Sequence, residues 1–320
     1  MIANVSQLDD SRIRLCIARA AAAQPTVQQV SQHQEERRKF ILPDGVELEF
    51  DYAPAKDGSG RPPLLFVHGS FHAAWCYREH FLPYFAAAGY DSYAVSLRGQ
   101  GESQRLPGMK ASSLAQHVAD LSSIVAALPR PAVLIGHSFG GLVAQRYVTG
   151  AADASGPAQL PQLAGLALLC AAPATGNSSL VMRVARKSPV MAVKMTWSMI
   201  TKSFVRNAAA CRELFFSEDL PPAELKKYQA LLSDNASPVP VIDVSKMKEE
   251  VPLPLPPKDH PPAFVLGGDK DLIVDVQALK ESAEVYSVQP VILENAAHDI
   301  MLDTRWQEAA DALSHWLSTL

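Results

Sequence analysis

The feature that most constrains this fold is a series of short, mainly apolar runs separated by segments with helical spacing. Between the runs, apolar side chains recur every three or four residues, as at Leu114, Val118 and Leu121. Such runs are typical of strands buried on both faces, which belong to parallel sheets covered by helices. We therefore predict an α/β fold with a mostly parallel central sheet and helices on both faces. The predicted strands are residues 63–67, 90–95, 132–135, 163–169, 263–266 and 290–293, and the predicted helices are residues 77–87, 113–128, 140–149, 276–285 and 304–320.

The alternation of strands and helices is interrupted once. Residues 174–250 carry helical patterns without an apolar run, and residues 251–262 contain six prolines. We predict that residues 37–173 and 262–320 form the α/β core. Residues 174–261 are predicted to form a helical cap that returns to the core through a proline-rich hinge.

Composition limits the functions open to the chain. Its 320 residues, 48 % of them hydrophobic, suffice for a large core. The formal net charge of -4 excludes the overall positive charge typical of duplex binding, so we expect no nucleic-acid partner. The four cysteines form no C-x-x-C pair, and we expect no metal site. Residues 1–36 fit no folded element and are predicted to be a disordered or targeting extension.

A G-x-S-x-G motif, Gly136-His137-Ser138-Phe139-Gly140, lies between a predicted strand and a predicted helix. A serine in this position lies on a sharp turn, with its hydroxyl exposed above the sheet. The glycines are needed because side chains would collide across so tight a turn. The following helix directs its N-terminal amides toward developing negative charge. We predict that Ser138 is a nucleophile.

A serine nucleophile needs a base to take its proton and a carboxylate to stabilise the resulting imidazolium. His298 follows the last predicted strand, which places it above the same edge of the sheet as the serine. Three carboxylates follow the preceding predicted strand, and all three are candidates at this stage: Asp269, Asp271 and Asp275.

Two backbone amides are expected to hold the oxyanion that forms during acyl transfer. One belongs to Phe139, the residue after the nucleophile, and the other to Ser70, in the loop after the first apolar run. Further residues are predicted to line the substrate pocket: Phe71, His72, His137, Met191, Met195, Met199 and Trp197.

The predicted cap has an unusual charge pattern. Residues 178–206 carry six basic residues and no acidic residue, although the whole chain is acidic. Met191, Met195 and Met199 share one helical face, and methionine adapts its shape to flexible apolar ligands. Either this face packs on the core while the charges are solvated, or the segment is a lipid-facing lid that makes a peripheral membrane contact.

Five motifs resemble the α/β-hydrolase superfamily in order and spacing. They are HGSFHAAW, SLRGQGES, GHSFGG, GGDKDLIV and AAHDIMLD, within residues 64–320. The resemblance implies the α/β-hydrolase fold and a triad of Ser138, His298 and Asp271, with Asp269 as the alternative acid. HGSFHAAWCY and YDSYAVSLRGQGES look most similar to plant and algal plastid hydrolases that include the chlorophyll dephytylases. They are less similar to the methylesterase and hydroxynitrile lyase branch.

Three departures refine this resemblance. Asp299 stands where hydroxynitrile lyases of this fold carry a lysine, and Ser138 stands where epoxide hydrolases carry an aspartate. Phe139 differs from the GHSRGG pattern typical of chlorophyllases.

The resemblance implies a serine carboxylic-ester hydrolase that needs no cofactor and no obligate protein partner. Its expected substrate is a hydrophobic long-chain ester, such as the phytyl ester of chlorophyll or of a derivative. A dephytylase would belong in the chloroplast, and the cytoplasm is the alternative. Two other functions stay open: a lysophospholipase or monoacylglycerol lipase, and a hydrolase-fold ligand receptor with little turnover.

Overall fold

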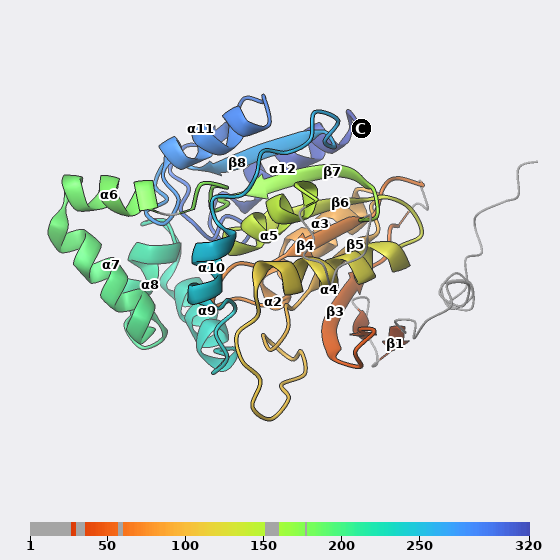
Figure 1. Ribbon diagram of the computed structural model, residues 1–320. Helices are drawn as coiled ribbons and strands as arrows, with labels where there is room; N and C mark the ends of the chain where they lie inside the picture. The colour runs from red at the N-terminus through yellow and green to blue at the C-terminus, as the bar shows by residue number, and fades with distance from the viewer. Residues whose placement is uncertain (1–26, 30–35, 57–59, 151–159, 177) are drawn as a thin grey trace, which may run out of the picture.

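One mixed sheet forms the centre of the molecule (Figure 1). The computed structural model describes residues 27–29, 36–56, 60–150, 160–176 and 178–320. Their nine strands lie in the order β1-β2-β3-β5-β4-β6-β7-β8-β9. The strands are β1 (Val27–Gln29), β2 (Glu36–Ile41), β3 (Glu47–Ala53), β4 (Leu64–Val67), β5 (Ser92–Val95), β6 (Ala132–His137), β7 (Leu163–Leu169), β8 (Ala263–Gly268) and β9 (Val291–Leu293). Neighbours from β5 to β9 run parallel, whereas β1, β2 and β3 join by antiparallel pairing. The predicted α/β fold with a mostly parallel sheet is therefore confirmed.

Helices cover both faces of this sheet, and the alternation of side chains along β4 shows why. Phe66 packs in one apolar cluster with Phe81, whereas Leu65 packs in a second cluster with Leu121. Each parallel strand therefore needs apolar residues at successive positions, which accounts for the unbroken runs in the sequence. The covering helices are α2 (Trp75–Arg78), α3 (Phe81–Ala87), α4 (Leu114–Ala127), α5 (Phe139–Val148), α11 (Val276–Val285) and α12 (Trp306–Leu317).

The single helix expected over residues 77–87 is wrong, because α2 and α3 are separate. Pro83 explains the break: a continuous helix would place its ring against the carbonyl of Glu79. In the structure, α3 begins at Phe81, so Pro83 falls in the first turn, where a missing N–H loses no helical hydrogen bond.

The expected extension of residues 1–36 lies mostly outside the described residues. Where it is described, the structure differs from the expectation: Val27–Gln29 form β1, which pairs antiparallel with β2, and β2 already begins at Glu36.

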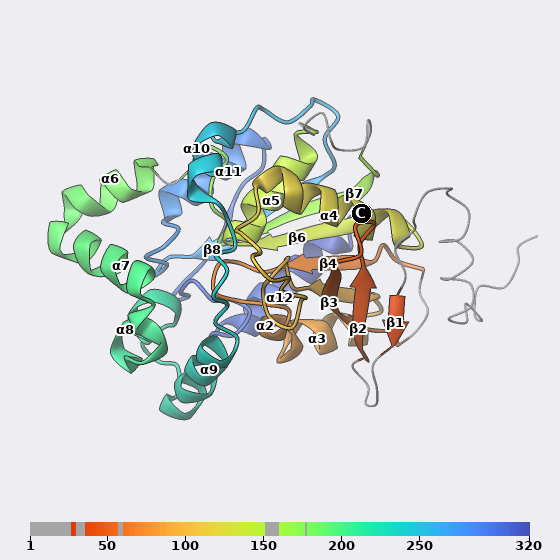
Figure 2. The ribbon, with the colours of Figure 1, turned by 60° about the horizontal axis from the view of Figure 1, so that its bottom comes forward.

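Between β7 and β8 the chain forms a helical insertion. Its helices are α6 (Ser178–Lys187), α7 (Pro189–Thr201), the 3₁₀ turn η1 (Ser203–Val205), α8 (Ala208–Phe215), α9 (Pro222–Asp234) and α10 (Val244–Glu250). Phe204, Phe215 and Tyr228 of the insertion belong to the same apolar cluster as Phe66, so its inner helices are packed onto the core. In both views α6 and α7 form the outer end, on the opposite side of the molecule from β1 (Figures 1 and 2). None of the helices formed by the described residues combines the length and apolar composition needed to cross a bilayer.

Candidate active site

Ser138 lies on a strained turn between β6 and α5. Its φ of 53° and ψ of -120° are rarely adopted by a residue with a side chain. The turn closes only because its neighbours are glycines: a Cβ on Gly136 would lie 2.5 Å from the Gly140 carbonyl oxygen, and one on Gly140 would lie 2.3 Å from the Val67 carbonyl oxygen. The backbone thus holds the Ser138 hydroxyl above the carboxyl ends of the parallel strands.

The structure brings Ser138, His298 and Asp271 together from three separate loops. The Ser138 Oγ lies 3.0 Å from the His298 Nε2, and the His298 Nδ1 lies 2.8 Å from the Asp271 Oδ2. The other Asp271 oxygen accepts from the backbone N–H groups of Ile273 (2.7 Å) and Val274 (2.8 Å), which fixes the orientation of the carboxylate. Because a carboxylate oxygen only accepts, the His298 Nδ1 carries the proton and its Nε2 is free to accept from Ser138.

The surroundings of His298 favour its protonated form. Burial disfavours the imidazolium, but the charge and hydrogen bond of Asp271, together with the charge of Asp299, outweigh burial and raise the pKa of His298 above its ordinary value. A base of this kind accepts the serine proton readily and stabilises the ion pair that results.

The other two candidate carboxylates serve other contacts. Asp269 is partly exposed and lies 2.8 Å from the Lys270 ammonium. Asp275 caps α11 through the backbone N–H of Ala278 and binds the guanidinium of Arg183. Only Asp271 of the three contacts His298, as the resemblance implied.

The predicted oxyanion donors flank the nucleophile. Ser70 and Phe139 line a cavity of about 170 Å³ together with Ser138 and His298. A Cβ on Gly69 would lie 2.7 Å from the Ser138 Cβ, so the loop that carries Ser70 passes directly over the serine. Phe139 is the first residue of α5, where backbone N–H groups have no acceptor within the helix. Both amides are therefore available to an oxygen bound beside Ser138.

The apolar space extends beyond this first cavity. A second cavity of about 340 Å³ is lined by Ser70, Phe71 and Met199, which also line the first. Two of the predicted pocket residues, Phe71 and Met199, are therefore at the site. Met191 and Met195 lie on the same face of α7 but line neither cavity. The prediction for Trp197 is wrong, because its side chain is on the outer face of α7 and is 66 % exposed.

His72 and His137 were predicted to line the substrate pocket. The structure instead buries both side chains beneath the site, outside the lining of either apolar cavity. The His72 Nδ1 lies 2.9 Å from the Ser70 carbonyl oxygen, and its Nε2 lies 2.9 Å from the Asp299 Oδ2. The His137 Nε2 donates to the His298 carbonyl oxygen at 2.9 Å. These contacts tie the loop of Ser70 and the strand end at His137 to the segment of His298.

The charges of this buried cluster are arranged around Asp299. Burial disfavours its carboxylate, but the charge and hydrogen bond of His72, with a smaller contribution from His298, keep the pKa of Asp299 below its ordinary value. Burial, together with the nearby His298, lowers the pKa of His137 to about 3, so this ring is neutral. Sequence reasoning missed the role of Asp299, for which the only signal was its position beside His298.

The helical insertion is anchored to the same segment. The Asp303 carboxylate accepts from the backbone N–H groups of Ser217, at the end of α8, and of Ala297, at 3.1 and 3.0 Å. The Asp299 N–H donates to the Phe215 carbonyl oxygen at 2.9 Å. The helical insertion is therefore hydrogen-bonded to the loop that carries His298.

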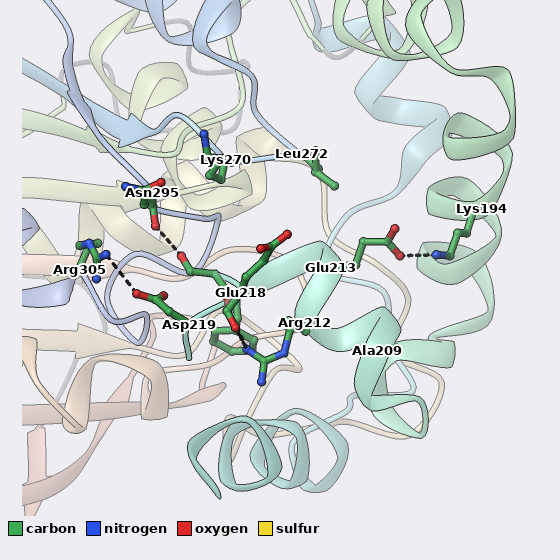
Figure 3. Close-up of a pocket in the computed structure, with 12 residues that line it drawn as sticks. Lys194, Ala209, Arg212, Glu213, Glu218, Asp219, Lys270, Leu272, Asn295 and Arg305 are labelled. Atoms are coloured by element: carbon green, nitrogen blue, oxygen red, sulfur yellow. Dashed lines mark hydrogen bonds and ion pairs between the residues drawn. The ribbon is translucent and has the colours of Figure 1, made fainter. Parts of the chain in front are cut away.

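A third cavity, of about 750 Å³, lies between α7, α8 and the loops after β8 and β9 (Figure 3). Three of the four cations that line it form ion pairs: Lys194 with Glu213, Lys270 with Asp269, and Arg305 with Asp219. The fourth, Arg212, donates to the backbone carbonyl oxygens of Ser217 and Glu218. The triad residues are absent from its lining among the described residues. We assign the chemistry to the smaller cavity at Ser138.

One group of side chains in the described part of the chain has the spacing of a metal site. His137, Cys170 and His298 bring one ligand atom each within 4.8 Å of one another. Burial, with the charge of Asp271 nearby, raises the pKa of the Cys170 thiol well above its ordinary value, whereas a metal needs the thiolate. Both ring nitrogens of His298 already contact Asp271 and Ser138. These residues do not fit a metal centre.

Comparison with known proteins gives the class that this fold and site define. Residues 64–312 match the profile of the Alpha/beta hydrolase family. The chain therefore belongs to the alpha/beta hydrolase family.

Individual relatives match over shorter regions. The chain is 34 % identical over 95 residues to the carbendazim hydrolyzing esterase of Nocardioides sp. (strain SG-4G), which covers 29 % of this chain and 37 % of that protein. It is 35 % identical over 81 residues to methylesterase 1 of Arabidopsis thaliana, which covers 25 % of this chain and 30 % of that protein. The matched regions thus span about a third of the length of these relatives.

A solved structure shows the fold over nearly the whole chain. The thermophilic esterase of Thermogutta terrifontis superposes with a TM-score of 0.59 and 22 % identity, covering 91 % of this chain and 98 % of that one.

Proposed function

We propose that this protein is a serine carboxylic-ester hydrolase. The observation that carries the proposal is the chain of contacts from Ser138 through His298 to Asp271, at the wall of an apolar cavity. The matched relatives named as esterases support the same reaction class.

The geometry accounts for each step of ester cleavage. The Ser138 Oγ attacks the ester carbonyl while the His298 Nε2 takes its proton, and the amides of Ser70 and Phe139 stabilise the resulting oxyanion. The imidazolium then gives its proton to the departing alcohol oxygen, which leaves an acyl group on Ser138. A water molecule, deprotonated by His298, releases the acid and restores the serine. Asp271 remains ionised throughout and holds the ring in the reactive orientation.

The two connected cavities favour an ester with a long apolar chain. Around Met199 and Phe71 their lining is largely aliphatic and aromatic, including Leu142, Ile242 and Val241. We propose that one chain of the substrate extends from Ser138 into the second cavity. The phytyl ester of chlorophyll, suggested by the motifs HGSFHAAWCY and YDSYAVSLRGQGES, is one ester of this type. The chloroplast location that it implies is likewise a proposal.

The first test is removal of the nucleophile. Ser138→Ala should lower hydrolysis of a p-nitrophenyl acyl ester by at least about 10³-fold, because it removes the hydroxyl on which the acyl-enzyme forms in the proposed mechanism. The matched control is Ser123→Ala, which should retain the full rate of hydrolysis. The Ser123 hydroxyl lies on α4 and, among the described groups, bonds only the Ala119 carbonyl oxygen. Full activity of Ser138→Ala would exclude the mechanism.

The substrate is identified by incubating the enzyme with chlorophyll a and with a mixed lipid extract, followed by mass spectrometry of the products. Release of phytol supports the dephytylase assignment. Release of fatty acid from monoacylglycerol or lysophospholipid, with chlorophyll intact, assigns the acyl-lipid alternative. Labelling of Ser138 by a fluorophosphonate without turnover beyond one equivalent would instead indicate a ligand receptor.

A further inference from the structure

Helix α7 is apolar on two opposite faces. On the inner face, Met195 and Met199 pack against the large apolar cluster of the core. Along the outer face runs a stripe formed by Val190, Val193, Trp197 and Ile200 (the outer stripe), whose side chains are 66 % to 79 % exposed. Apolar side chains of this size on the outside of a helix cost solubility unless another surface covers them.

This exposure is concentrated in one place. Six of the ten large apolar side chains recorded as exposed among the described residues lie on α6 or α7, and they include Val181 and Met182 of α6. The α6–α7 pair is also the outermost part of the insertion (Figures 1 and 2). A flat or convex surface can therefore reach the outer stripe without meeting the core.

The charge around the outer stripe is positive. Residues 178–206 contain no acidic residue. Arg186, Lys187 and Arg206 are exposed and form no ion pair with any residue that the structure describes. The combination of an apolar stripe with exposed cations matches the interface of an anionic bilayer, where apolar side chains enter the acyl region and cations contact phosphate.

The outer stripe also adjoins the route to the nucleophile. Ile200 belongs to the stripe and lines the second cavity, which shares Phe71 and Met199 with the cavity at Ser138. Val244, which is also exposed, lines the same cavity. A lipid chain beside Ile200 thus has an apolar path toward the serine.

We propose that the outer stripe of α7, with Arg186, Lys187 and Arg206, docks this protein on an anionic lipid bilayer and delivers a membrane-embedded ester to the cavity beside Ile200. A second copy of the chain fits less well, because a symmetric pair would bring two sets of exposed cations together. Only the delivery step rests on the proposed esterase function, and docking itself requires no catalysis.

Docking is measured on the full chain carrying Ser138→Ala, which separates binding from hydrolysis. We expect this protein to co-sediment with vesicles of phosphatidylcholine and phosphatidylglycerol and much less with phosphatidylcholine alone. Val190→Ser together with Val193→Ser should lower the partition coefficient by about tenfold or more, since two exposed apolar anchors are lost. The same two substitutions in the active chain should leave hydrolysis of a water-soluble ester unchanged, which shows that the fold and the triad are intact.

Leu255→Ser is the matched control for the apolar change. Leu255 is 79 % exposed but lies on the proline-rich return segment, outside α6 and α7, so its substitution should leave vesicle binding unchanged. Trp197→Phe should remove most of the blue shift of tryptophan fluorescence on vesicle addition.

A second set of variants tests the charge. Arg186→Gln, Lys187→Gln and Arg206→Gln together should abolish the preference for anionic vesicles and flatten its salt dependence. The control replaces three exposed lysines outside α6 and α7: Lys226→Gln, Lys258→Gln and Lys280→Gln. This variant should keep both the preference for anionic vesicles and its salt dependence.

Three results would overturn the proposal. They are absence of binding to anionic vesicles, equal binding by the serine variant of the outer stripe, and a dimer in sedimentation velocity that the same variant splits. The last result would show that a second copy covers the stripe. None of them affects the assignment of the triad, which rests on hydrolysis of the water-soluble ester.

Discussion

At the scale of single residues, the imidazole of His298 lies near two carboxylates with different roles. Asp271 bonds its Nδ1 directly, whereas Asp299 acts through its charge, and both raise the pKa of His298 against the effect of burial. In the proposed mechanism His298 must be neutral to accept the serine proton, so activity should fall as pH decreases through this raised pKa. The acid limb of kcat/KM is therefore expected above the ordinary histidine value of about 6.5.

Asp271→Asn tests this arrangement. Loss of the carboxylate charge should move the acid limb to lower pH and lower kcat by about 10³- to 10⁴-fold, since the ring loses its orienting acceptor. The measurement is a pH profile of kcat/KM on a p-nitrophenyl ester. Asp269→Asn, in the same loop but paired with Lys270, should change neither quantity, and an unchanged profile for Asp271→Asn would remove Asp271 from the mechanism.

His72 contacts the carbonyl oxygen of Ser70, the proposed oxyanion donor, and Asp299 in turn contacts His72. We expect His72→Gln to lower kcat by about 10- to 100-fold with KM changed by less than about threefold, because a displaced Ser70 amide weakens the transition state more than the bound substrate. Steady-state kinetics on one soluble ester gives both values. A rise in KM with kcat unchanged would indicate instead that His72 contributes to substrate binding.

At the scale of secondary-structure elements, the insertion and the histidine loop depend on each other through Asp303. Asp303→Ala should leave the N–H groups of Ser217 and Ala297 without their acceptor and lower the free energy of unfolding by about 3 kcal/mol. It should also lower kcat, because Ala297 precedes His298. Denaturant titration and kinetics measure the two effects, and Asp259→Ala, an exposed carboxylate on the return segment, is the control. Wild-type stability of Asp303→Ala would show that these hydrogen bonds contribute little.

Periodicity in the sequence predicted most elements of the core because parallel strands must be apolar at successive positions. The predicted strand of residues 163–169 has the limits of β7, whereas the break between α2 and α3 was missed although Pro83 signals it. β1 could not be predicted, since Val27–Gln29 pair with β2 through backbone groups and carry no distinctive side-chain pattern.

The same limit applies to the site. Ser138 was predicted from a motif, and His298 from its position after the last strand. The choice of Asp271 over Asp269 and Asp275 required the resemblance to the α/β-hydrolase superfamily. Helical spacing placed Met191 and Met199 on one face of α7, yet it could not show that Trp197 on the other face points to solvent. Spacing defines a shared face, and only tertiary packing decides which face is buried.

At the scale of the whole molecule, the cavity at the insertion and the cavity at Ser138 share lining residues, and Met199 is one of them. In the proposed function the acyl chain passes from one cavity to the other beside Met199. Met199→Trp should narrow this junction and lower kcat/KM for p-nitrophenyl dodecanoate by about tenfold relative to the acetate ester. Met191→Trp, on the same face but lining neither cavity, should leave the ratio unchanged. An equal loss on both esters for Met199→Trp would show that the acyl chain does not pass this point.

The two ends of the insertion differ in how freely they can be altered. The inner end shares the Asp299–Phe215 and Asp303–Ser217 hydrogen bonds with the loop of His298, so exchanging it would disturb the base itself. The outer pair, α6 and α7, can accept new surface side chains with the base left in place. Redesign of specificity in this scaffold can therefore start from the exposed side chains of α6 and α7, whereas Arg183, which binds Asp275, and Met199, which lines the cavity at Ser138, should be kept.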